Sequence, residues 1–162
     1  MRRTGLFLVL LLLSLLCGCD RGSRTDVVLF CDAFNRTAPT MRIAEQDVCR
    51  RSDTELLVTV NDVLLRLITD DTSAILSVTA TAEAGNTAQL REAAETAFSV
   101  MAEPFGEQVP QMPDDLLQSA EPTVQQIETK QFYYLIYADR EGVTLQQRSC
   151  SFPLPSQRLL RR

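Results

Sequence analysis

The feature that most constrains the fold is one amphipathic helical pattern set between strand-like segments. Five apolar side chains recur at helical spacing on one face: Leu90, Ala94, Ala97, Phe98 and Met101. Asn86 and Gln89 have the spacing of an N-terminal capping box. Pro104 and Gly106 follow the last apolar residue and favour the end of a helix there. The pattern therefore predicts a helix over residues 87–103.

Strand-like patterns precede this helix. Residues 55–60 and 75–82 alternate between two sets of side chains, which is typical of strands that present two different faces. Residues 63–68 are nearly all apolar, which fits either a buried strand or a short helix.

The C-terminal part of the chain predicts a hairpin. Residues 131–138 and 143–152 flank a turn at residues 139–142. Along the first strand Phe132, Tyr134 and Ile136 would share one face, and Tyr133, Leu135 and Tyr137 the other. Because both faces are apolar, we expect a central strand or an edge covered by a partner. We favour core packing over an aromatic recognition surface for these side chains.

Between helix and hairpin, residues 104–123 contain four prolines and several acidic residues. This composition predicts a surface connection with one helical turn at residues 114–119, and its length suggests a functional or mobile segment. The order of elements predicts an α+β fold. We expect a small single domain in which one main helix packs on an antiparallel sheet.

The N-terminus has the form of an export signal. Arg2 and Arg3 supply positive charge, and the segment from Leu6 to Leu16 is apolar apart from Ser14. This run is too short for a transmembrane helix, which needs about 20 residues to cross about 30 Å of hydrocarbon. It fits the apolar region of a secretory signal peptide.

Residues Leu16, Cys17, Gly18 and Cys19 resemble the lipobox of bacterial lipoproteins. The resemblance covers about the first 20 residues and implies cleavage after Gly18, with a lipid attached to Cys19. Cys17 occupies the variable position, where alanine or serine is commoner. Diacylglyceryl and N-acyl groups of this class anchor a protein firmly, because several acyl chains insert together.

Asp20 follows the residue expected to carry the lipid. In enteric-type sorting, aspartate at this place resembles the signal that retains a lipoprotein on the inner membrane. We therefore favour the inner membrane over the outer membrane, with the protein facing the periplasm.

These features divide the chain into four parts. They are a signal peptide at residues 1–18, a lipid-anchored tether at 19–26, an α+β domain at 27–152 and a basic tail at 153–162. For the tail, which contains Arg158, Arg161 and Arg162, we favour a solvated segment over contact with a phosphate-rich surface or a partner.

The mature chain is acidic. Removal of Arg2 and Arg3 with the signal peptide changes the formal net charge from −5 to −7. Negative charge argues against nucleic acid as a partner and against broad adhesion to anionic headgroups. The membrane is therefore expected to hold the protein through the lipid.

Three cysteines remain after Cys19, and export to an oxidising compartment favours one disulfide among them. Cys31–Cys49 is the first choice, because a short loop closes readily. Cys49–Cys150 and Cys31–Cys150 are the alternatives.

No catalytic, cofactor-binding or metal-binding residues are predicted. The chain has no histidine, which excludes histidine-based triads and the usual zinc and haem ligands. The doubled acids Asp70–Asp71 and Asp114–Asp115 are expected in solvated turns or helix caps. We expect a non-enzymatic binding or assembly component of an envelope complex. The alternative is an inhibitor or immunity lipoprotein that neutralises a toxin or cell-wall hydrolase.

Overall fold

The computed structural model of the chain describes residues 25–83, 85–117 and 121–150. The predicted signal peptide, Cys19, Asp20 and the basic tail lie outside the described residues. No helix within the described ranges has the length and hydropathy that crossing a bilayer requires.

Seven strands of the described chain form one antiparallel sheet in the order β1-β2-β3-β4-β7-β6-β5. They are β1 (Val48–Ser52), β2 (Glu55–Val60), β3 (Val63–Thr69), β4 (Ile75–Glu83), β5 (Thr123–Glu128), β6 (Phe132–Ala138) and β7 (Gly142–Ser149). The helices are α2 (Val27–Thr37), α3 (Thr87–Ala102) and α4 (Asp114–Leu117), with 3₁₀ turns η1 (Glu45–Asp47) and η2 (Glu103–Phe105).

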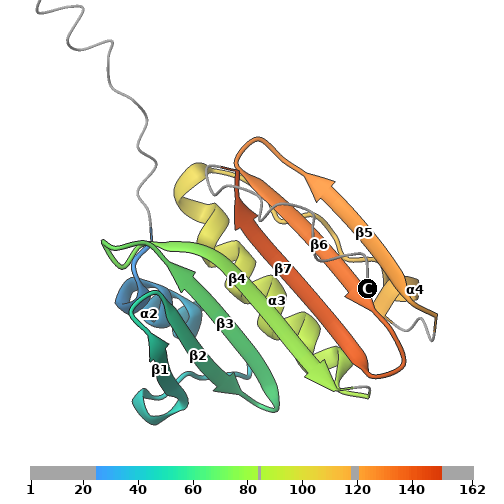
Figure 1. The fold of residues 1–162 in the computed structure, drawn as a ribbon, viewed down its shortest axis with the longest axis horizontal. Helices are drawn as coiled ribbons and strands as arrows, with labels where there is room; N and C mark the ends of the chain where they lie inside the picture. The colour runs from blue at the N-terminus through green and yellow to red at the C-terminus, as the bar shows by residue number, and fades with distance from the viewer. Residues whose placement is uncertain (1–24, 84, 118–120, 151–162) are drawn as a thin grey trace, which may run out of the picture.

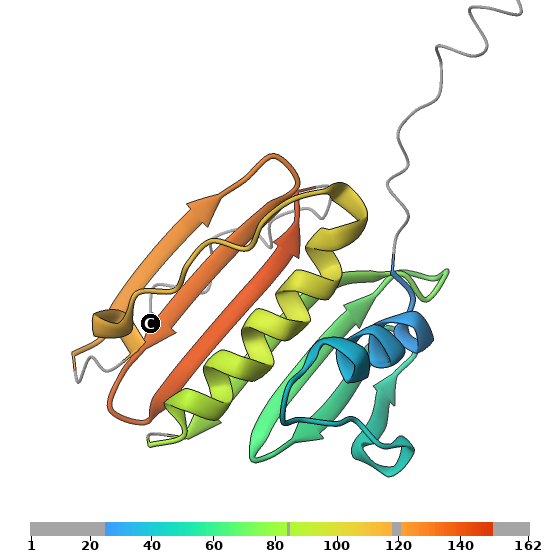
Figure 2. The ribbon, with the colours of Figure 1, turned by 180° about the vertical axis from the view of Figure 1, so that it is seen from behind.

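The order of elements repeats around β4. Helix α2 precedes the meander β1-β2-β3, and helix α3 precedes the meander β5-β6-β7. The two meanders flank β4 on opposite sides of the sheet. Both long helices lie on the same face, so the fold has two layers (Figures 1 and 2). The α+β class predicted from the sequence is confirmed, with two long helices where one main helix was expected.

The core lies between the sheet and these two helices. Its largest fully buried side chains are Phe30, Phe34, Phe98, Phe132, Met41, Leu65, Leu67, Leu90 and Leu145. Burial of apolar surface of this kind contributes about 25 cal/mol per Å² removed from water and is the main stabilising term for such a domain.

Helix α2 was not predicted, although its ends carry recognisable local features. The Asp26 carboxylate accepts a hydrogen bond from the Leu29 amide at 2.9 Å, which caps the first turn. Phe30 and Phe34 lie one turn apart and are both fully buried. The helix ends before Pro39, since the residue that precedes a proline avoids helical backbone angles. The polar residues around these two aromatic side chains masked the helical pattern.

Helix α3 confirms the predicted helix to within one residue at its C-terminal end. The predicted capping box is wrong: the side chain of Asn86 makes no capping hydrogen bond. The segment that follows α2 also contacts this helix. The amide and the hydroxyl of Thr40 donate hydrogen bonds to the carboxylate of Glu92 at 3.0 and 2.7 Å.

The strands before α3 and the hairpin confirm most of the predicted pattern. Residues 63–68 lie within β3, so the strand alternative is the correct one. Strands β6 and β7 pair around the predicted turn, and β6 is a central strand of the sheet. In β4 the alternation is interrupted at the start of the strand, where the irregular pairing near Thr69 buries Ile75 and leaves Leu76 partly exposed.

The connection between α3 and β5 is held to the domain by a few anchors. Met112 and Leu117 are buried, and Arg91 of α3 donates to the Met112 carbonyl oxygen at 3.2 Å. Arg91 also forms an ion pair with Asp114. The helical turn predicted at residues 114–119 is confirmed over Asp114–Leu117, which form α4. Strand β5 was not predicted, because alternation in its sequence TVQQIE is weak.

Candidate functional site

The largest feature that the core does not use is the sheet surface opposite the helices. We call it the helix-free face; it faces the viewer in Figure 1. Three rows of paired side chains cross it. The first row is Thr59, Leu64, Thr81, Thr144, Tyr137 and Val124; the second is Leu57, Arg66, Thr79, Gln146, Leu135 and Gln126; the third is Glu55, Ile68, Ser77, Arg148, Tyr133 and Glu128.

Apolar and polar side chains are mixed on this face. The predicted aromatic strand accounts for part of the mixture: Phe132, Tyr134 and Ile136 are buried in the core, as expected. Their neighbours Tyr133 and Tyr137 lie on the helix-free face. A surface that combines tyrosine and leucine with polar side chains has the composition of protein interfaces.

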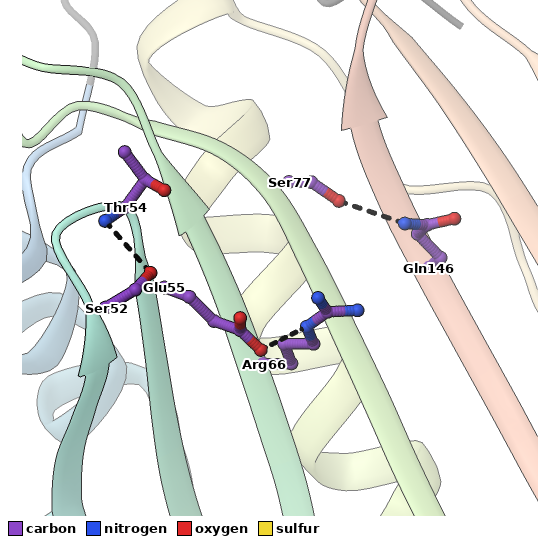
Figure 3. Close-up of polar contacts among 6 residues, drawn as sticks. All are labelled: Ser52, Thr54, Glu55, Arg66, Ser77 and Gln146. Atoms are coloured by element: carbon purple, nitrogen blue, oxygen red, sulfur yellow. Dashed lines mark hydrogen bonds and ion pairs between the residues drawn. The ribbon is translucent and has the colours of Figure 1, made fainter. Parts of the chain in front are cut away.

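The polar side chains of the face bind one another across the strands (Figure 3). Arg66 Nε donates to Glu55 Oε1 at 2.7 Å, which joins β3 to β2. Gln146 Nε2 donates to Ser77 Oγ at 3.1 Å, which joins β7 to β4. The Arg66–Glu55 ion pair is exposed, so water competes with it and it contributes little to stability. The hydrogen bond to Ser77 is partly buried.

Exposure differs strongly between the rows of the face. In the third row Ser77 is 2% exposed and Arg148 is 8% exposed. In the first row Leu64 is 40% exposed, Tyr137 39% and Val124 62%. The first row therefore presents apolar surface to solvent, whereas the third row buries an arginine.

A hollow of about 460 Å³ lies at the first-row end of the face. We call it the acidic hollow, because its eleven lining residues include four carboxylates and no lysine or arginine. The carboxylates belong to Asp62, Glu83, Asp139 and Glu141. Leu64 and Tyr137 of the first row line it as well. The hollow thus combines negative charge with exposed apolar surface.

The turns that form the acidic hollow are specified by local sequence. Asn61 and Asp62 have positive φ values of 44° and 64°, as a two-residue hairpin turn between β2 and β3 requires. Gly142 begins β7 against the backbone of β4, where an added Cβ would lie 2.4 Å from the carbonyl oxygen of Ala82. Any larger residue there would displace one of the two strands.

Asp139 accepts hydrogen bonds on both of its carboxylate oxygens. Its Oδ2 accepts a hydrogen bond from the Tyr137 hydroxyl at 2.7 Å, and its Oδ1 accepts from the amide of Glu141 at 2.8 Å. The hydrogen bond from Tyr137 and then that from Glu141 lower the pKa of Asp139. The same hydrogen bond raises the pKa of the Tyr137 hydroxyl.

A second cavity, of about 600 Å³, lies on the helix side of the domain, below α3 and the following loop. Glu95, Glu103 and Glu107 line it, and Glu107 Oε2 accepts a hydrogen bond from Thr129 at 2.7 Å. In the described ranges no group of three or more histidine, cysteine, aspartate or glutamate side chains is arranged to hold a metal ion. We regard the helix-free face as the better candidate, since it joins a hollow to exposed apolar side chains.

The three predicted disulfide cysteines are free thiols in the structure. Cys49 pairs with Leu57, so its side chain lies on the helix-free face, whereas Cys31 belongs to α2 on the opposite face. Three strands separate Cys49 on β1 from Cys150, which follows β7. Two cysteines need Cα atoms within about 7 Å to form a disulfide.

The doubled acids lie where the sequence placed them. The carboxylate of Asp70 accepts hydrogen bonds from Thr72 and Ala74 in the turn before β4. Asp114 and Asp115 begin α4, where negative charge favours the N-terminus of a helix. The carboxylates of the acidic hollow were not predicted as a group, because they are far apart in sequence and only the strand order brings them together.

Comparisons with protein-family models, with curated proteins and with solved structures found no match to this chain.

Proposed function

We propose that this protein is a lipid-anchored, non-enzymatic binding or assembly component of a bacterial envelope complex, and that the helix-free face is its docking surface. The lipobox resemblance at Leu16–Cys19 supports export and anchoring, with Asp20 favouring the inner membrane. The domain would then be held close to the membrane on the periplasmic side by its short tether.

The observation that carries the proposal is the junction of exposed apolar side chains with the acidic hollow. Leu64 and Tyr137 provide apolar contact area, and the four carboxylates provide charge that attracts a basic partner. A partner surface with arginine or lysine beside apolar side chains complements both properties. Electrostatic attraction would speed association, and apolar burial would slow dissociation.

The same surface supports a second candidate, an inhibitor or immunity lipoprotein that neutralises a toxin or cell-wall hydrolase. Many proteins that act on anionic polymers carry basic surfaces, and an acidic inhibitor would be attracted to them. The identity of the captured partner separates the two candidates. An enzyme or toxin that loses activity when bound favours inhibition, and a structural envelope protein favours assembly.

The test is affinity capture from detergent-solubilised membranes with the tagged protein and two variants. Leu64→Glu adds a charge to the docking surface, and the matched control Val28→Glu adds the same charge to an exposed apolar position of α2. We expect a stoichiometric partner with the wild type and with the control, and at least tenfold less with Leu64→Glu. A partner that Leu64→Glu retains in full would exclude the helix-free face as the docking surface.

A further inference from the structure

We infer that the outer edge of β5 accepts an extended segment of the partner, which joins the sheet as a further strand antiparallel to β5. The segment places an apolar side chain opposite Val124 and a basic side chain opposite Glu128. This inference rests on the proposed function, because it specifies how a basic partner is bound at the border of the helix-free face. The backbone pairing of β5, the contrast between the two sheet edges and the exposed side chains of β5 lead to it.

The hydrogen bonds of the hairpin β5–β6 determine which backbone groups of β5 point outward. In an antiparallel pair, opposed residues alternate between hydrogen-bonded and non-bonded pairs. The Thr129 amide donates to the Phe132 carbonyl oxygen at 2.9 Å, so Ile127 and Gln125 are the next residues that bond to β6. The outward backbone groups belong to the residues between and beside them, Val124, Gln126 and Glu128.

The pairing on the other side of β6 agrees with this assignment. The Asp139 amide donates to the Gly142 carbonyl oxygen at 3.0 Å, so the backbone of Tyr137 bonds to β7 and not to Val124, its partner on β5. Strand β5 ends the strand order, and no described element runs along its outer side (Figures 1 and 2). Within the described ranges, this edge therefore presents a row of amide donors and carbonyl acceptors to a further strand.

The two edges of the sheet differ in how they resist strand addition. Strand β1 has five residues, its pairing with β2 is irregular between Arg50 and Ser52, and Arg50 and Arg51 give it positive charge. Irregular pairing and cationic side chains commonly protect an edge strand. Strand β5 has six residues in unbroken register with β6 and contains no proline, lysine or arginine, so neither device protects it.

The exposed side chains of β5 indicate the chemistry of the added segment. Val124 is 62% exposed, and Glu128 is the charged residue of the strand. Both lie on the helix-free face, so the edge continues the docking surface. Side chains directly opposite each other on neighbouring strands interact, and opposite charges or two apolar groups are favourable pairs. The added segment therefore matches β5 with an apolar and a basic residue on this face.

A second copy of the chain matches this edge less well. Antiparallel pairing of two β5 strands keeps both helix-free faces on the same side of the joined sheet. The sequence of β5 offers no cation to place opposite Glu128 of the other copy. A basic partner supplies that charge, which favours a partner segment over self-association.

Gln125 offers a further contact on the opposite face of β5. Among the described residues its buried side-chain oxygen Oε1 has no hydrogen-bond partner. A buried acceptor of this kind normally has a donor, because burial removes it from water. A hydroxyl side chain opposite Gln125 on the added strand can donate to it.

The experiment measures amide hydrogen exchange by NMR on the mature chain, residues 19–162 with Cys19→Ser, with and without a peptide at millimolar concentration. The blocked peptide TKTTTVT, when antiparallel, places lysine opposite Glu128, valine opposite Val124 and a threonine opposite Gln125. We expect exchange at least about fivefold slower for the outward amides of β5. The amides of Gln125 and Ile127 already bond to β6 and should not change. This alternation distinguishes an added strand from contact with side chains alone.

Matched variants separate the edge from the rest of the surface. Gln126→Pro removes one outward amide and leaves the bonds of its neighbours to β6, so it should abolish the protection, whereas Gln126→Thr should retain it. Unchanged exchange of the Ile136 amide, which bonds to β5, shows that the Gln126→Pro sheet is intact. Leu64→Glu lies on β3 and should not alter the protection, so failure on the face and failure at the edge are distinguishable.

The reversed peptide TVTTTKT has the same composition but places its lysine opposite Val124, and it should protect at least about threefold less. Equal protection by the two peptides overturns the inferred register. Absent or uniform changes in exchange overturn the inference, as does protection that Gln126→Pro retains. Protection of the same amides without peptide, increasing with protein concentration, also overturns it, in favour of a second copy on this edge.

Discussion

The side-chain amide of Gln147 lies 2.9 Å from the hydroxyl of Tyr134, its direct partner on β6, inside the core. Gln147 Nε2 donates to the Tyr134 oxygen and also to the carbonyl oxygen of Phe98 on α3, at 3.2 Å. Gln147 is 1% exposed. A polar side chain this deeply buried is stable only when hydrogen bonds replace its contacts with water. The pair therefore fixes the position of α3 on the sheet.

Replacement of Gln147 by leucine removes the amide that bonds to both groups. We expect the free energy of unfolding to fall by about 1–3 kcal/mol, because the buried Tyr134 hydroxyl loses its partner. Urea unfolding followed by circular dichroism measures the change. Gln126→Leu, at an exposed position of β5, is the control and should change stability by less than about 0.5 kcal/mol. Equal effects of the two substitutions would contradict a stabilising role for this pair.

Stability at alkaline pH depends on Tyr134. Burial raises the pKa of its hydroxyl from 10.0 to about 12. Between these two values the unfolded chain releases the Tyr134 proton while the folded chain keeps it, so stability falls as pH rises. Urea midpoints at several pH values from 9 to 12 measure the fall. The variant Tyr134→Phe should show a smaller decrease, since the other tyrosines titrate in both proteins; equal slopes would refute the assignment.

The cysteines are expected to differ in reactivity. Burial, and then the nearby Asp32 carboxylate, raises the pKa of the Cys31 thiol, and burial followed by Glu128 raises that of Cys150. Cys49 is exposed. Because the thiolate is the reactive form, Cys49 should be alkylated at least several-fold faster near pH 8. Peptide mass spectrometry after timed alkylation measures the three rates. Absence of labelling at two cysteines until reduction would instead reveal a disulfide between them.

Arg91 is expected to hold the connection between α3 and β5. Arg91→Met keeps the aliphatic stem but removes the bonds to the Met112 carbonyl and to Asp114. The Leu117 amide, which donates to Pro113, should exchange its hydrogen several-fold faster. Gln89→Ala, at an exposed position of α3, is the control. Unchanged exchange in Arg91→Met would show that Met112 and Leu117 hold the connection by burial alone.

Anchoring is expected to depend on Cys19. Cys19→Ser removes the sulfur that would carry the lipid, so the protein should move from the membrane pellet to the soluble fraction. Cys17→Ser is the matched control and should remain in the pellet. Intact-mass spectrometry of the native protein should show a lipid-modified chain that begins at residue 19. A product that still carries residues 1–18 would contradict the predicted processing.

Asp20 provides a separate test of sorting. Asp20→Ser should shift the protein from the inner to the outer membrane, as the enteric-type sorting rule predicts for the loss of this aspartate. Density-gradient separation of the two membranes measures the distribution. An unchanged distribution would limit Asp20 to the role of a polar tether residue.

Local sequence patterns predicted the elements whose side chains repeat with a clear period. Helix α3 and the hairpin β6–β7 are of this kind. In each of them a single regular spacing of apolar residues accounts for the buried face. Helix α2 was missed, since only Phe30 and Phe34 carry its buried face among polar neighbours. Its signals were the Asp26 cap and two phenylalanines one turn apart.

The sequence by itself determined the α+β class and the acidic composition of the chain, and it predicts an export signal. These depend on short motifs, residue periods and composition, which act within a few residues of the chain. The tertiary structure alone decided the strand order, and with it which face the helices cover. Strand order depends on pairing between distant segments, such as β4 with β7, and local preferences do not encode it. That pairing brings Asp62, Glu83, Asp139 and Glu141 to one hollow beside an uncovered apolar row.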